Sequence, residues 1–138
     1  MPGETGSIRY ALREPFEQAV ESVRRSLEDR GLRVAGQLDV ARRVERSLGI
    51  VLRPCRIVFV LPGPAVLSKG SIHPWAAVFL PLHVVISGHG GQTEIQAQNS
   101  VYANSEAAAP AVVVPILETQ AQISEAIEAI AMRPSLVV

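Results

Sequence analysis

Hydrophobic and polar residues alternate along several short stretches of the chain. Alternation with a period of two is typical of a β-strand that is covered on one side. It predicts strands over residues 8–12, 32–38, 82–87 and 93–98. Residues 56–61 (RIVFVL) are apolar at nearly every position, which predicts a strand in the sheet interior that is covered, at least in part, on both sides.

Two longer stretches show the three-to-four-residue spacing of an amphipathic helix. The first covers residues 15–30, where apolar positions recur from Phe16 to Leu27 and Gly31 follows as a helix stop. The second covers residues 116–131, in which isoleucines recur at the same spacing. Each helix has one apolar stripe that must be buried against another element.

A third, short helix is predicted over about 40–48, because Asp39 is a good N-cap and Gly49 a good stop. Short connections among the last three strands, including GHGG at 88–91, favour antiparallel pairing. The apolar stripes of the two long helices can both be buried against one face of the sheet. The predicted fold is therefore a single two-layer α+β domain over residues 1–138, with about five mostly antiparallel strands and both long helices on one face.

Successive residues of a strand point to opposite faces of the sheet, so odd and even positions should lie on different faces. One face should be covered by the helices and the other should be open. The helix-covered face should hold Tyr10, Leu38, Ile57, Phe59, Leu61, Leu82, Val84, Ile86 and Ile95. The open face should have an apolar centre with a polar rim, which is typical of an interaction surface. We expect a homodimer through that face, with a wet surface or a ligand surface as the alternatives. The candidate contact residues are Val58, Val60, Val85, Gln96 and Gln98.

Composition narrows the classes of partner. Thirteen basic and thirteen acidic residues give a net charge of zero, which argues against a nucleic-acid partner. Residues 1–69 carry a net +4 (twelve basic, eight acidic) and residues 70–138 a net −4 (one basic, five acidic), so the two halves can attract each other. A single cysteine fits a reducing compartment. Neither a secretory leader nor a membrane span is recognisable, so we expect a cytoplasmic protein.

Residues 15–58 share a pattern with a known family. The pattern consists of Phe-Glu-x-Ala-Val, a glycine before a strand, Asp-Val opening a short helix, Leu-Gly and Arg-Pro, and VFLPLHVVISGHGG at 78–91 extends it. On these residues the chain, over about 8–98, resembles the domain of unknown function (DUF) 302 family. The resemblance implies a strand–helix–four-strand–helix core of the TATA-binding-protein-like type, without an established activity. Many relatives have Cys where this chain has Leu82, and an aromatic residue where it has Cys55.

Cys55 and the histidines are the residues with the most reactive side chains. Cys55 lies between Arg53 and Arg56, which favour a thiolate, but the sequence offers no evident base beside it. We therefore interpret Cys55 as a small, half-buried strand residue. His73, His83 and His89 match no compact zinc motif, and we expect neither a metal nor another cofactor.

Five arginines cluster around the short helix, and four of them are candidate ligand-binding residues. The cluster consists of Arg43 and of the candidates Arg42, Arg46, Arg53 and Arg56. They could hold a small anion together with His83, or simply form a solvated helix face. The sequence favours a non-enzymatic module that binds a ligand or a protein partner. The alternative is an enzyme or metal-binding protein that uses His83, Cys55 and the nearby arginines.

Overall fold

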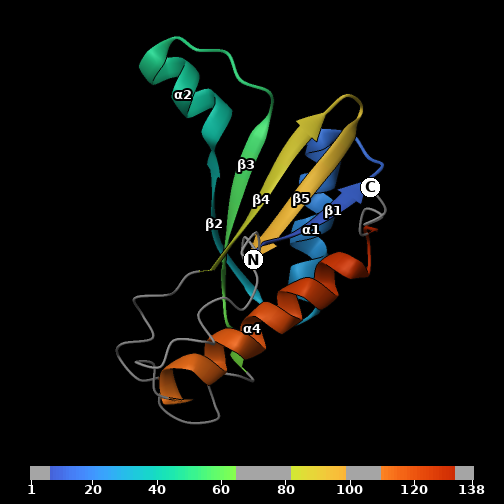
Figure 1. Ribbon diagram of the computed structural model, residues 1–138, viewed down its shortest axis with the longest axis vertical. Coiled ribbons are helices and arrows are strands. Elements are labelled where there is room, and N and C mark those ends of the chain that lie inside the picture. Colours follow the sequence, from blue (N-terminus) through green and yellow to red (C-terminus); the bar gives the residue numbers. More distant parts are fainter. Residues whose placement is uncertain (1–6, 65–81, 99–109, 133–138) are drawn as a thin grey trace, which may run out of the picture.

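The computed structural model describes residues 7–64, 82–98 and 110–132 of the chain. Within these ranges one sheet contains β1 (Ser7–Leu12), β2 (Arg33–Asp39), β3 (Cys55–Leu61), β4 (Leu82–His89) and β5 (Gln92–Gln98). The strand order is β1-β5-β4-β3-β2, and every neighbouring pair is antiparallel. The five predicted strands and the predicted α+β class are confirmed (Figure 1).

The described helices are α1 (Phe16–Asp29), α2 (Val40–Leu48) and α4 (Pro110–Glu128). Helix α4 begins six residues before the predicted start at residue 116. The preceding segment (PAVVVP) has no polar position that would reveal a helical period. None of the helices in the described ranges is long and apolar enough to cross a membrane.

Helices α1 and α4 pack against each other and against the same face of the sheet, as predicted. Tyr10, Val23, Val84, Ile95 and Ile127 are fully buried in this one core. Two polar contacts fix the helices. The Tyr10 hydroxyl donates to the Glu128 carboxylate (3.2 Å), and the Ser26 hydroxyl donates to the Ala126 carbonyl oxygen (2.6 Å).

The prediction of which β3 residues face the helices was wrong. Val58 and Val60 are fully buried, because they lie opposite Val84 and Leu82 on the helix-covered face. They are core residues and cannot belong to a dimer face. Phe59 lies opposite His83, on the other face of the sheet. Since nearly every position of β3 is apolar, its own sequence does not reveal its parity, and only the register with β4 decides it.

Leu38 was also assigned to the wrong face. The β2–β3 register shifts between Val34 and Gly36, as it does at a β-bulge, and this shift reverses the parity of the residues that follow. Leu38 therefore lies opposite Ile57, on the face that α1 and α4 leave open.

Helix α2 lies at the end of the sheet away from α4 (Figure 1). Its first turn is capped by the Asp39 carboxylate, which accepts a hydrogen bond from the Arg42 backbone N–H (2.9 Å). It ends at Gly49, whose φ of +71° is the left-handed conformation that favours glycine. No residue of α2 is buried, so this helix contributes little to the core.

Candidate functional site

The open face of the sheet carries an apolar stripe along β3. Ile57, Phe59 and Leu61 point to this face, and the β2 and β4 residues opposite Ile57 are Leu38 and Val85. All five side chains are half-buried although neither α1 nor α4 covers them. We call these five residues the β3 stripe. Within the described residues, these five side chains form a row of large hydrophobic groups on a sheet face that neither α1 nor α4 covers.

The remainder of the open face is polar. Gln96 lies opposite Val85, and Arg9 lies opposite Gln96 in the neighbouring strand. Glu94 lies between Ala11 and Ser87. The predicted candidates His83, Val85 and Gln96 are therefore on the open face, whereas the side chain of Gln98 lies outside the described part.

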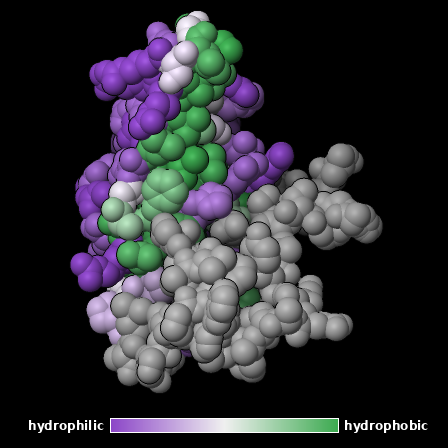
Figure 2. Space-filling model, turned by 90° about the vertical axis from the view of Figure 1, so that its left-hand side faces the viewer, coloured by the Kyte–Doolittle hydropathy of each residue, from purple (hydrophilic) through white to green (hydrophobic). Residues whose placement is uncertain are grey.

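Four large hydrophobic residues at the end of α2 and in the segment that leads to β3 are exposed. They are Leu48 (68% exposed), Ile50 (50%), Val51 (78%) and Leu52 (43%). Figure 2, which views the molecule from the side of β2 and α2, shows a hydrophobic band along the long axis with hydrophilic residues on both flanks. The band extends upward to the height at which α2 lies in Figure 1. Contiguous apolar surface of this kind marks interaction sites more often than chance exposure does.

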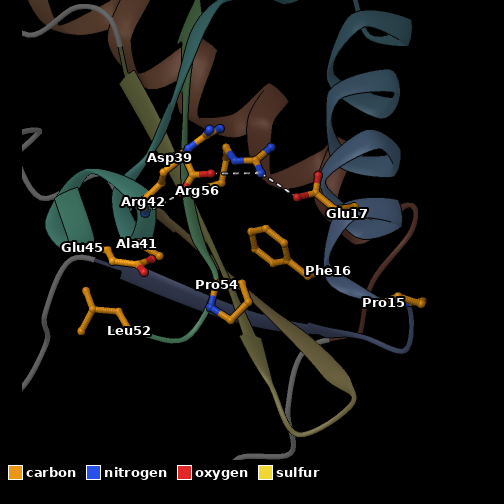
Figure 3. A pocket seen from close by; sticks show the side chains of 10 residues that line it. All are labelled: Pro15, Phe16, Glu17, Asp39, Ala41, Arg42, Glu45, Leu52, Pro54 and Arg56. Atoms are coloured by element: carbon orange, nitrogen blue, oxygen red, sulfur yellow. Dashed lines mark hydrogen bonds and ion pairs between the residues drawn. The ribbon is translucent and has the colours of Figure 1, made fainter. Parts of the chain in front are cut away.

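A cavity of about 510 Å³ lies between the start of α1, helix α2 and the segment that leads into β3 (Figure 3). We call it the α1–α2 cavity. Its lining residues are Pro15, Phe16, Glu17, Asp39, Ala41, Arg42, Glu45, Leu52, Pro54 and Arg56.

Arg56 is the central charge of this cavity, and its side chain is only 15% exposed. Its guanidinium donates to the Glu17 carboxylate (2.8 Å) and lies 3.8 Å from the Asp39 carboxylate. It also donates to the Gln37 amide oxygen (3.3 Å) and lies 5.3 Å from the centre of the Phe16 ring, at cation–π distance. Nε of Arg56 is buried without a hydrogen-bond partner. Arg56 thus joins α1, β2 and β3, and two carboxylates already balance its charge.

The structure does not bring the four candidate arginines into one site. Arg42 and Arg56 line the α1–α2 cavity, but Arg46 and Arg53 are not part of its lining. Arg46 is in the last turn of α2, and Arg53 donates a hydrogen bond to Nδ1 of His89.

Cys55 and His83 share the open face but are far apart along it. Cys55 lies opposite Ser87, and His83 lies opposite Phe59, four residues further along β3. At about 3.3 Å per residue this places them roughly 13 Å apart. Burial, together with the negative charge of Asp39, raises the pKa of the Cys55 thiol above its ordinary value. In the described ranges no three His, Cys, Asp or Glu side chains cluster as metal ligands would, and His73 lies outside those ranges.

Sequence reasoning did not find the α1–α2 cavity. Phe16 was assigned to the apolar stripe of α1, and Glu45 and Leu52 were not singled out. The only signal was indirect, because Asp39 as the cap of α2 and Arg56 at the start of β3 both had to lie near the same end of the sheet.

The described geometry defines a two-layer α+β domain with one covered and one open sheet face. Residues 8–130 match the family described as Domain of unknown function DUF302, and the chain belongs to this family. The chain is also similar to the crystal structure of the "uncharacterized conserved protein DUF302 from Bacillus stearothermophilus". That similarity has a TM-score of 0.74 at 18% sequence identity and covers 91% of this chain and 98% of the other. No curated protein matches this sequence.

Proposed function

We propose that this chain is a non-catalytic interaction module that forms a homodimer through the β3 stripe. The observation that carries the proposal is the row Ile57, Phe59 and Leu61 on a sheet face that neither long helix covers. Full burial of an exposed large apolar side chain contributes about 1.5–3 kcal/mol, and each of these half-buried side chains would add part of that amount under a second protein surface.

A second copy of the same chain suits this surface because the stripe can pack on itself. In a two-fold dimer the contact is self-complementary: if residue i of one copy contacts residue j of the other, then residue j of the first copy also contacts residue i of the second. A two-fold axis beside Phe59 would bring the two Phe59 rings together and place Ile57 of each copy near Leu61 of the other. The polar half of the face, with Arg9 and Glu94, would then form the rim.

Charge does not oppose such an association. The chain has a net charge of zero, so two copies experience no net long-range repulsion. The open face itself carries charges of both signs, with Arg9 and Arg33 against Glu94.

The alternative, an enzyme or metal-binding protein built on His83, Cys55 and the arginines, has less support. These residues lie at separate points of the described structure, and the raised pKa of Cys55 favours the unreactive thiol.

The experiment is the molar mass in solution, measured by sedimentation equilibrium for the unmodified chain and for Phe59→Asp. The unmodified chain should have twice the 14.8 kDa mass of one chain. Phe59→Asp should be monomeric at the same concentration, because each copy would place a carboxylate in the apolar contact.

Val114→Asp is the matched control, since Val114 is also a large apolar residue but is 48% exposed on α4, which packs on the other face of the sheet. It should remain dimeric. A monomeric unmodified chain, or a dimer that Phe59→Asp leaves intact, would rule out this interface.

A further inference from the structure

The α1–α2 cavity is unused by the proposed dimer and has the size and lining of a small-molecule site. Its 510 Å³ lies within the usual range of about 300–1,000 Å³ for such sites. Apolar side chains from three segments line it, namely Phe16 from α1, Ala41 from α2, and Leu52 and Pro54 from the segment before β3 (Figure 3). An apolar wall with a few charged groups is the common pattern of a ligand site.

The charges in the cavity determine which ligand fits. Three carboxylates (Glu17, Asp39 and Glu45) and two guanidiniums (Arg42 and Arg56) line it, which leaves an excess of one negative charge. Glu17 and Asp39 are both engaged with Arg56, and Asp39 also caps α2. An anion that approached Arg56 would have to compete with these two carboxylates.

Glu45 is the carboxylate in this lining that is not engaged. Within the described residues its side chain has neither an ion pair nor a hydrogen bond. Glu45 lies on the α2 wall of the cavity, and Figure 3 shows the Phe16 ring on the opposite, α1 side, with Leu52 and Pro54 below the space between them. Because Arg56 already lies at cation–π distance from the Phe16 ring, the ring contributes apolar surface, and the Glu45 carboxylate is the group that binds an organic ammonium by charge.

We propose that the α1–α2 cavity binds a small amphipathic amine. Its ammonium would pair with the Glu45 carboxylate, and its apolar body would lie against Phe16, Leu52 and Pro54. The small anion expected from the arginine cluster fits less well, because Glu17 and Asp39 already engage Arg56, so an anion would depend on Arg42 alone in a lining with three carboxylates.

The test is isothermal titration calorimetry of the full chain with two probes of similar size, 2-phenylethylamine and 3-phenylpropionate. The amine should bind, and the carboxylate should bind at least about tenfold more weakly. Glu45→Gln should weaken amine binding about tenfold, because it removes the charge but keeps the shape. Glu125→Gln removes one exposed carboxylate outside the cavity and should leave amine binding unchanged.

A second variant tests the Phe16 ring as an apolar wall of the cavity. Phe16→Ala should weaken amine binding because it removes this apolar wall, and thermal unfolding of the same sample shows that the variant is folded. Absence of amine binding, tighter binding of 3-phenylpropionate, or unchanged binding in Glu45→Gln would each overturn the proposal. The monomeric Phe59→Asp variant should bind the amine as the unmodified chain does, so the two proposals can fail separately.

Discussion

At the residue scale, neighbouring side chains of β3 have opposite environments. Val58 and Val60 are fully buried against α1 and α4, whereas Ile57 and Phe59 lie on the open face. A polar atom introduced at Val60 would have no water beside it, but the same atom at an exposed valine would remain hydrated.

Val60→Thr should therefore lower the free energy of unfolding by about 1–3 kcal/mol, because threonine has nearly the shape of valine but buries a hydroxyl. Val51→Thr makes the same change at a side chain that is 78% exposed and should alter stability by less than about 0.5 kcal/mol. Urea unfolding of both variants provides the measurement. An equal decrease in the free energy of unfolding for the two variants would contradict the assignment of Val60 to the core.

Cys55 gives a second prediction at this scale. Burial, with a smaller contribution from Asp39, raises the pKa of its thiol. The rate of alkylation by iodoacetamide should therefore reach half of its maximum at a higher pH than for free N-acetylcysteinamide, which has no carboxylate, in the same buffer. Asp39→Asn keeps a helix-capping side chain but removes the charge, and it should shift this midpoint downward. A midpoint below that of N-acetylcysteinamide would show instead an activated thiolate.

At the element scale, α2 differs from α1 and α4 because it has no buried residue. It is held by its caps, by half-buried contacts on one side and by the neighbouring β3. An element with so few buried contacts opens locally at a lower free energy than the whole domain. Its N-cap, the Asp39 carboxylate, should therefore control its local stability.

Asp39→Ala should destabilise α2 by about 1 kcal/mol, and Asp39→Asn by much less, because asparagine also accepts the Arg42 N–H bond. Hydrogen exchange read by NMR should show faster exchange of the α2 amides in Asp39→Ala, with the α1 amides unchanged. Equal acceleration in both helices would mean that α2 unfolds only with the whole domain.

The sequence predicted the elements well because each has a clear local signal. Alternation marked four of the strands, a continuous apolar run marked β3, three-to-four spacing marked α1, and the Asp39 cap and Gly49 stop marked α2. The face of β3 could not be read locally, since residues on both of its sides are apolar. The sequence around the bulge between Val34 and Gly36 looks like regular alternation, so the bulge could not be predicted. The bulge places Leu38 on the open face.

At the scale of the whole molecule, α1 and α4 cover one face of the sheet, and among the described residues neither of these helices covers the other face. The sequence led to this conclusion because two amphipathic helices need only one face. It placed the wrong valines there, but Val85 and Gln96 do lie on the open face. The α1–α2 cavity was out of reach, because it depends on three segments that meet only in the fold.

The central claim is that two copies of the chain meet through the β3 stripe. The most direct measurement is an isotope-filtered NMR experiment on a mixture of labelled and unlabelled chains, which detects contacts between copies only. The account predicts intermolecular contacts from the Phe59 ring to the Phe59 ring and to the methyl groups of Ile57 and Leu61 of the other copy. Intermolecular contacts that involve α1 or α4 instead, or no such contacts at concentrations where the mass is that of a dimer, would contradict it.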